Sequence, residues 1–199
     1  MAKDEKYSWV SFEPLVERLE GSMTVSSHRE FAEKIGIAAS TLSNIIRGTQ
    51  GVQTDVIARM AAYFNCSVCK LFRFEGIDIK PRYEKPFFIR YEATSGKVTY
   101  EPLRLLFFTN YGQDKWKSKL SQFYDKVEPV IDLSEERKAQ ILAALGKEKK
   151  VVTGEEKQQR GLSSSIRTKI RRNERVNLKV IYNICKVLGC TPDYVMSYQ

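Results

Sequence analysis

Residues 36–48 read GIAASTLSNIIRG, and residues 161–173 read GLSSSIRTKIRRN, so one short pattern occurs twice in this chain. Each copy is followed by a second matching block, which reads VQTDVIARMAAYFNCSVCKLF at 52–72 and VNLKVIYNICKVLGCTPDYVM at 176–196. Two blocks repeated in the same order indicate that the chain contains one structural module twice.

A third pair of matching blocks lies upstream, VSFEPL at 10–15 and VTYEPL at 98–103. The second blocks are offset by 124 residues, whereas these opening blocks are offset by 88. The second module is therefore about 36 residues longer than the first. We infer a duplication followed by an insertion into the second copy.

The charge balance of the chain points to a polyanionic partner. The chain has 199 residues, 42% of them hydrophobic, which is enough for one medium domain or two small ones with real cores. Its formal net charge is +9 and its pI is about 9.3. Such a balance is typical of proteins that bind nucleic acid or an anionic membrane surface.

A membrane partner is disfavoured by the sequence. No apolar stretch reaches the length of a bilayer span, and the opening residues MAKDEKYSWV do not form a signal peptide. Ala2 stands where myristoylation requires glycine, and no prenylation motif ends the chain. We therefore expect a cytoplasmic, nucleoid-associated protein with reduced cysteines and no membrane partner.

The four cysteines offer zinc binding as an alternative. Cys66 and Cys69 form C-x2-C, and Cys185 and Cys190 form C-x4-C. Cys66 and Cys190 are equivalent in the repeat and suit small buried apolar positions. Cys69 corresponds to Asp193, so the repeat does not share a ligand scheme. We expect no metal site and no cofactor.

Helical spacing and capping residues divide the first module into five short helices. Ser11 is expected to cap the first helix, and Ser27 with Glu30 forms a capping box for the second. Gly36 ends the second helix and suits a left-handed conformation. The positions expected to face inward are Leu15, Leu19, Phe31, Ala32, Ile35, Leu42, Ile45, Val56, Ile57, Met60, Ala61, Phe64, Val68, Leu71 and Phe72.

The middle of the chain has a different character. Residues 77–97 carry two prolines, a Thr-Ser-Gly turn and aromatic residues, which predict a linker with a short β-hairpin or an extended tether. The inserted segment contains two helix candidates. One places Trp116, Leu120, Phe123 and Val127 on one face, and the other begins at Ser134.

The repeated pattern resembles the Cro/C1-type (XRE-like) helix-turn-helix family of DNA-binding proteins. The resemblance covers residues 10–72 almost completely, and about 98–110 and 161–198 in the second copy. It implies a mainly α fold with two lambda-repressor-like helix-turn-helix bundles. We expect a first domain over 1–75, a linker over 76–97, and a second domain over 98–199 with a helical insertion at about 112–160.

The third helix of each module carries the side chains expected to contact DNA. Asn44 suits adenine, Arg47 suits guanine or phosphate, and Ser163 is expected to cap the third helix of module two. His28 stands at a helix start as a phosphate contact or a plain surface residue. The expected DNA-binding residues are His28, Ala39, Ser40, Ser43, Asn44, Arg47, Ser163, Ser164, Ser165, Arg167, Thr168, Lys169, Arg171 and Arg172.

The second copy departs from the family pattern at two places. Arg167 aligns with the inward-facing Leu42 of module one. The residues aligned with the second helix, EEKQQR, contain no equivalent of Phe31-Ala32. Either residues 136–146 supply that helix and 147–160 form a loop, or the turn of module two is degraded.

These observations favour a sequence-specific, double-stranded DNA-binding transcriptional regulator, predicted to be a repressor from a bacterium, a phage or a mobile element. A monomer would bind an imperfect palindrome, and a homodimer would bind a longer array. The alternative is a protein inhibitor or adaptor, such as a phage-borne anti-defence protein, that regulates its own synthesis and binds a protein partner through residues 76–160.

An enzyme is the third hypothesis and the weakest. A single histidine allows no histidine-metal cluster, and the sequence has no phosphate-cradling glycine loop and no nucleophile motif. The acidic pairs Glu135-Glu136 and Glu155-Glu156 suit helix starts, and they leave a magnesium-dependent nuclease open. We expect no catalytic residues.

Overall fold

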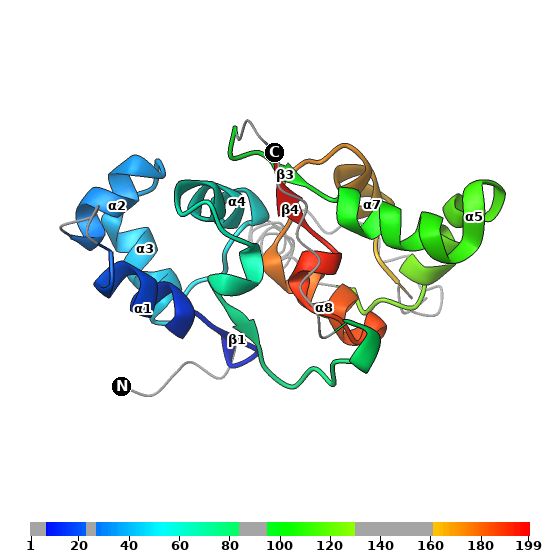
Figure 1. Cartoon of the computed structure of the whole chain (residues 1–199), viewed down its shortest axis with the longest axis horizontal. Coiled ribbons are helices and arrows are strands. Elements are labelled where there is room, and N and C mark those ends of the chain that lie inside the picture. Colours follow the sequence, from blue (N-terminus) through cyan, green and yellow to red (C-terminus); the bar gives the residue numbers. More distant parts are fainter. Residues whose placement is uncertain (1–6, 23–26, 84–94, 130–160) are drawn as a thin grey trace, which may run out of the picture.

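A computed structural model describes residues 7–22, 27–83, 95–129 and 161–199, and these residues form a mainly helical fold. They contain seven α-helices and two small antiparallel sheets of two strands each. Figure 1 shows α1, α2 and α3 at one side of the molecule, α5 and α7 at the other side, and α4 and α8 between them. The expected mainly α fold is confirmed.

The first module closes on itself through its two ends. Val10 pairs with Phe74 in an antiparallel sheet, and the helices lie between these strands in the sequence. Ser27 accepts a hydrogen bond from the backbone N–H of Glu30, as the capping box predicts. The elements are β1 (Val10–Ser11), α1 (Glu13–Glu20), α2 (His28–Lys34), α3 (Ala39–Ile46), α4 (Thr54–Tyr63), the 3-10 helix η2 (Val68–Lys70) and β2 (Arg73–Phe74).

The start of α1 differs slightly from the expectation. Its N-cap is Phe12 rather than Ser11, and no side chain caps the helix there. Ser11 instead accepts a hydrogen bond from the backbone N–H of Glu13 at 3.4 Å. Pro14 lies in the first turn, where a missing backbone donor is tolerated. Leu15 and Leu19 are buried as predicted.

The second module repeats this arrangement. Val98 pairs with Tyr198, which are the equivalents of Val10 and Phe74. Asn177 caps α8, and Gly189 ends it in the left-handed conformation. The elements are β3 (Val98–Thr99), α5 (Glu101–Tyr124), α7 (Ser164–Arg171), α8 (Leu178–Leu188), the 3-10 helix η4 (Pro192–Tyr194) and β4 (Ser197–Tyr198).

Helix α5 joins two helical segments at a kink. Gly112 has non-helical backbone angles, φ 74° and ψ 173°, between the opening helix and the helix candidate of the insertion. The expected inward face of that candidate is confirmed, because Leu120, Phe123 and Val127 are buried and Trp116 packs against the core. The second candidate, from Ser134, lies outside the described residues.

The end of α5 takes the place that α2 has in module one. The N–H of Leu162 donates to the carbonyl of Tyr124 at 2.9 Å, just as the N–H of Ile37 donates to Ala32 at 2.9 Å. Phe123-Tyr124 therefore replaces Phe31-Ala32 in front of the turn. This position was not assigned to the end of α5 from the sequence, and both EEKQQR and residues 136–146 lie outside the described residues.

The described part of the linker lies against module two. The N–H of Lys80 donates to the carbonyl of Gly189, and the ring of Tyr83 meets that of Tyr194 at 4.9 Å. These residues belong to or adjoin the 3-10 helix η3 (Pro81–Tyr83). The hairpin was expected within residues 77–97, and residues 84–94 of this range lie outside the described residues.

The two modules meet through equivalent residues. The N–H of Thr54 donates to the carbonyl of Val176 at 2.9 Å, and the N–H of Leu178 donates to the carbonyl of Val52 at 2.8 Å. Gln53 thereby forms a β-bridge with its own equivalent, Asn177. Reciprocal contacts of this kind mark a twofold interface, as in a symmetric dimer, but here both halves belong to one chain.

A buried carboxylate ties the two 3-10 helices together at the same junction. Asp193 accepts a hydrogen bond from the hydroxyl of Ser67 at 2.6 Å and one from the backbone N–H of Cys69 at 3.3 Å. Burial raises the pKa of the Asp193 carboxyl, and these hydrogen bonds oppose that shift. Across the junction Trp9 packs on Tyr182, with ring centroids 5.2 Å apart. One continuous core therefore runs through both modules.

Candidate nucleic-acid interface

Helix α3 is fixed by its apolar side and presents a polar side outward. Gly36 ends α2 with φ +69°, and the chain turns there into α3. Leu42 and Ile45 are fully buried, and their burial fixes which side of α3 faces outward. Ala39 and Ser40 are consequently exposed at its start. An exposed polar helix after a tight turn has the geometry of a major-groove reader.

The outer side of α3 carries a small hydrogen-bonded cluster. Arg47 donates from Nη2 to the hydroxyl of Ser43 at 2.9 Å and to Oδ1 of Asn44 at 3.3 Å. Its Nε also donates to the backbone carbonyl of Ser43 at 3.2 Å. The guanidinium is thereby held beside the amide, and the two groups form one polar surface. Together they offer the donors and acceptors that match guanine and adenine edges.

Helix α7 presents a more basic surface from the equivalent position. Leu162 and Ile170 are buried and anchor the helix, and Ser163 caps it by accepting a hydrogen bond from the N–H of Ile166 at 3.4 Å. The predicted cap is confirmed. Thr168 is half-buried, whereas the remaining outward residues are exposed, namely Ser164, Ser165, Lys169, Arg171 and Arg172.

Arg167 is engaged inside module two. Its Nη2 donates to Oδ1 of Asp125 at 2.6 Å, and its Nε donates to the carbonyl of Leu162 at 2.7 Å. The guanidinium also lies over the ring of Tyr124, 5.8 Å from the centroid. Arg167 therefore joins the start of α7 to the end of α5, where Leu42 packs in module one. Arg167 was expected among the DNA contacts, which should point outward, so this placement differs from the expected one.

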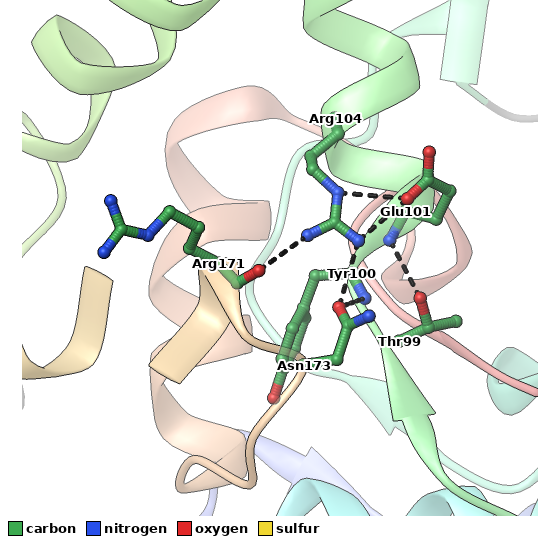
Figure 2. A network of polar contacts seen from close by, with 6 residues as sticks. All are labelled: Thr99, Tyr100, Glu101, Arg104, Arg171 and Asn173. Atoms are coloured by element: carbon green, nitrogen blue, oxygen red, sulfur yellow. Dashed lines mark hydrogen bonds and ion pairs between the residues drawn. The ribbon is translucent and has the colours of Figure 1, made fainter. Parts of the chain in front are cut away.

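The end of α7 is held by a network that sequence reasoning missed (Figure 2). Arg104 donates to the backbone carbonyl of Arg171 at 3.2 Å, to Oδ1 of Asn173 at 3.1 Å and to the carboxylate of Glu101 at 2.8 Å. The N–H of Tyr100 also donates to Oδ1 of Asn173, at 3.0 Å. One side-chain oxygen thus joins the loop after α7 to the start of α5.

Asn173 suits this role because of its backbone conformation. Its φ is +57°, and its equivalent in module one is Gly48, with φ +66°. Asparagine tolerates this left-handed conformation better than most residues with a side chain. It therefore ends the helix as glycine does and adds an anchor that glycine lacks. The sequence signal for this anchor was that an asparagine stands where module one has the turn glycine Gly48.

A buried chain of hydroxyl groups connects this loop to module one. The N–H of Val176 donates to the hydroxyl of Thr54 at 3.0 Å, and that hydroxyl lies 2.8 Å from the phenol of Tyr100. The phenol in turn donates to the carbonyl of Glu174 at 3.1 Å. Burial raises the pKa of Tyr100, so the phenol keeps the proton that it donates. The orientation of α7 is therefore coupled to α4.

Basic side chains line a cleft between the two modules. The cleft has a volume of about 640 Å³. Its lining includes the basic residues Arg59, Lys97, Lys169 and Arg175 and the acidic residues Asp55 and Glu174. The excess of cations fits a path for a polyanion past the junction.

The remaining predicted DNA contact is His28, and the four cysteines were the candidates for a metal site. His28 is exposed as the first residue of α2. Cys66, Cys185 and Cys190 are buried and Cys69 is half-buried; all four are free thiols. Among the residues that the structure describes, no group of three or more His, Cys, Asp or Glu is placed to hold a metal ion. The acids near 135 and 155 lie outside these residues.

Comparison with known families identifies both modules. Residues 17–71 match a helix-turn-helix family, and residues 147–199 match the Cro/C1-type HTH DNA-binding domain. The chain carries two Cro/C1-type helix-turn-helix domains. The matches of this tandem helix-turn-helix protein include α3 and α7 and together span more than half of the chain. No curated protein and no solved structure matches it.

The tandem helix-turn-helix protein is thus a DNA-binding protein. Helix α5 precedes the second match, although its end supplies the helix in front of the turn. No helix among the described segments is long and apolar enough to cross a membrane.

Proposed function

We propose that the protein is a sequence-specific transcriptional repressor that binds double-stranded DNA as a single chain, with α3 and α7 in successive major grooves. The reciprocal hydrogen bonds between residues 52–54 and 176–178 carry this proposal. They join the two modules through equivalent residues, as a symmetric dimer joins its subunits, and this supports two reading helices held in a fixed relation. Such dimers read two half-sites about 34 Å apart, one turn of DNA.

Several further observations support this proposal. The exposed residues at the start of both helices are short, and exposed basic residues follow. These are Arg47 at the end of α3, and Lys169, Arg171 and Arg172 at the end of α7. The formal net charge of +9 favours association with a polyanion. The intramolecular junction buries the surfaces through which one module would otherwise pair, so a second copy of the chain is not needed for two-site reading.

Binding experiments with matched variants test the proposal. Fluorescence anisotropy would compare a fragment from upstream of the protein's own gene with scrambled DNA across a salt series. Asn44→Ala/Arg47→Ala should abolish the preference for the upstream fragment, because this pair forms the recognition surface of α3. If that variant retains the wild-type preference, α3 does not read bases.

The second module needs its own variant and a control. Lys169→Ala/Arg172→Ala should also abolish the preference, whereas Arg73→Ala/Lys186→Ala removes the same charge outside α3 and α7 and should retain it. Footprinting should show protection longer than one half-site. Protection of a single half-site, with the α7 variant unaffected, would contradict a role for module two in reading DNA. Operator-linked reporter expression should fall when the protein is present.

The protein-partner alternative has one observation in its favour. Phe108 and Tyr111 are exposed on one side of α5, 45% and 46% respectively, within the segment 76–160. Large apolar side chains of this kind are common at protein interfaces. We propose, as a second function, that this side of α5 binds a protein partner. The variant Phe108→Ser/Tyr111→Ser should then abolish recovery of that partner in a pull-down while leaving DNA binding intact.

A further inference from the structure

The recognition helices of the two modules can be compared position by position. Gly36 and Gly161 both have positive φ, +69° and +87°, and both turn the chain into the reading helix. Ile45 and Ile170 are equivalent and both are buried, with 1% and 2% of their surface exposed. The two helices therefore have the same rotational phase, and each outward residue of α3 has one counterpart on α7.

Three outward positions keep their chemistry between the helices. Ser40 corresponds to Ser165, and Arg47 corresponds to Arg172. Position 43 keeps its hydroxyl, since Ser43 corresponds to Thr168. Two positions change clearly. The half-buried Ile46 corresponds to the exposed Arg171, and at the centre of the surface Asn44 corresponds to Lys169. That position changes from an amide to an ammonium group.

The two side chains differ in what they recognise. The amide of Asn44 has a donor and an acceptor, so it pairs with both N7 and the N6 amino group of adenine. The ammonium of Lys169 only donates, so it suits the two acceptors N7 and O6 of guanine and repels the amino group of adenine. We infer that the operator has two non-identical half-sites, with adenine read by Asn44 and guanine by Lys169 at equivalent positions.

The arginine that both copies carry at the end of the helix, Arg47 or Arg172, also has different neighbours in the two modules. Arg47 is held by Ser43 and Asn44 on the side of α3. Arg172 instead lies toward Glu174, with Nη1 3.8 Å from the carboxylate. The arginine therefore forms one unit with the central residue in module one but not in module two. This difference adds to the asymmetry of the half-sites.

The junction fixes which module pairs with which. Asp193 has Cys69 as its counterpart, and its hydrogen bonds reach across to module one. Two copies of module two would bring two buried Asp193 carboxylates to this interface, and like charges there repel. The counterpart of Ser67 is Thr191, whose hydroxyl is buried without a partner in the described structure. The interface is thus built for one copy of each module.

A second contact gives the same preference. The polar pair Thr54 and Tyr100 has the apolar counterpart Leu178 and Phe12, all buried. Pairing two copies of module one would remove the phenol from the buried hydroxyl of Thr54. An unmatched buried hydroxyl is unfavourable, so the mixed pair is preferred. The bound chain therefore has a defined direction on its operator.

The inference rests on the proposed function and is tested by selecting binding sites from random double-stranded DNA with the full-length chain. Wild type should enrich two half-sites about one turn apart that carry adenine in one and guanine in the other at the equivalent position. Lys169→Asn should convert the site to adenine in both halves. Asn44→Lys should convert it to guanine in both halves.

The exchange of both residues is the sharpest variant. Asn44→Lys/Lys169→Asn keeps composition and charge and should move adenine and guanine to the opposite halves. Affinity for the wild-type operator should fall roughly ten-fold or more in each single variant and recover on its matched site. Melting temperatures should stay near that of wild type, since both side chains lie on the surface side of their helices.

The possible outcomes separate the two proposals. Identical half-sites for wild type, or unchanged bases in both single variants, would overturn the inference while leaving sequence-specific binding intact. Enrichment of no sequence by wild type would refute the proposed function, and the inference would fall with it.

Discussion

Replacing Tyr100 by phenylalanine tests whether the buried hydroxyl chain joins the two modules. The substitution removes the hydrogen bond from the phenol to the carbonyl of Glu174 and the one shared with Thr54. At about 1 kcal/mol for each, the free energy of unfolding should fall by about 2 kcal/mol. Urea unfolding followed by circular dichroism measures this change.

A double-mutant cycle isolates the contact between modules. Thr54→Val removes the hydroxyl that meets Tyr100 and accepts from Val176, so it should also lower the free energy of unfolding by about 2 kcal/mol. The shared hydrogen bond is lost in both single variants. The double variant should therefore cost about 1 kcal/mol less than the sum of the two.

A control and a clear refutation complete this experiment. Thr54→Ser keeps the hydroxyl and loses one methyl group, so it should lower stability by about 0.8 kcal/mol or less. Additive single variants, within about 0.3 kcal/mol, would mean that Thr54 and Tyr100 are not energetically coupled. The position of α7 would then not depend on α4 through this chain.

Three further predictions concern the turns and the cysteine at the junction. Asn173→Ala should lower the free energy of unfolding by about 2 kcal/mol or more, because it removes the side-chain anchor and places alanine at a positive φ. Asn173→Gly also removes the anchor but relieves the strain, so it should lower the free energy of unfolding less. Thermal unfolding compares the two variants. Gly161→Ala should be far more damaging than Gly112→Ala, because a Cβ at 161 would lie 2.6 Å from the carbonyl oxygen of Tyr124, whereas at 112 it meets no atom within 4 Å. Both glycines have positive φ, so equal losses in their melting temperatures would refute the steric argument. Burial raises the pKa of the Cys69 thiol to about 12, so little thiolate is present at pH 8. Iodoacetamide at pH 8 should therefore label Cys69 only after unfolding. Fast labelling of Cys69 in the native chain would contradict this burial.

The same shift predicts the direction of a pH effect on stability. The folded chain holds the proton of Cys69 more tightly than the unfolded chain, in which the thiol pKa is about 8.5. The stabilising contribution is complete below that value and is lost as the pH rises toward about 12. Cys69→Ser should reduce the slope of unfolding free energy against pH in this alkaline window.

Local features of the fold were predictable because they depend on residues close together in sequence. The cap at Ser27, the left-handed Gly36 and the buried face of Leu42 and Ile45 follow from patterns within single helices and turns. The kink at Gly112 was not foreseen, because an isolated glycine inside a helical pattern does not distinguish a break from a continuous helix.

The missed features depend on contacts between distant segments. Tyr124 precedes the turn glycine Gly161 in space but is separated from it by a long segment of sequence. Arg104 and Asn173 meet although 69 residues separate them in the sequence. Arg167 looked like a surface cation because its partner, Asp125, belongs to another helix. Periodicity cannot reveal such pairs, since each residue is ordinary within its own segment.

The bridge between residues 52–54 and 176–178 has a consequence for how the protein responds to its own abundance. Separate subunits must first meet, so at low levels the occupancy of their operator rises steeply with concentration. Two readers within one chain have an effective mutual concentration set by their connection, independent of how many molecules the cell holds. If the chain binds its operator as proposed, operator occupancy should therefore follow a simple hyperbola with a Hill slope of about one.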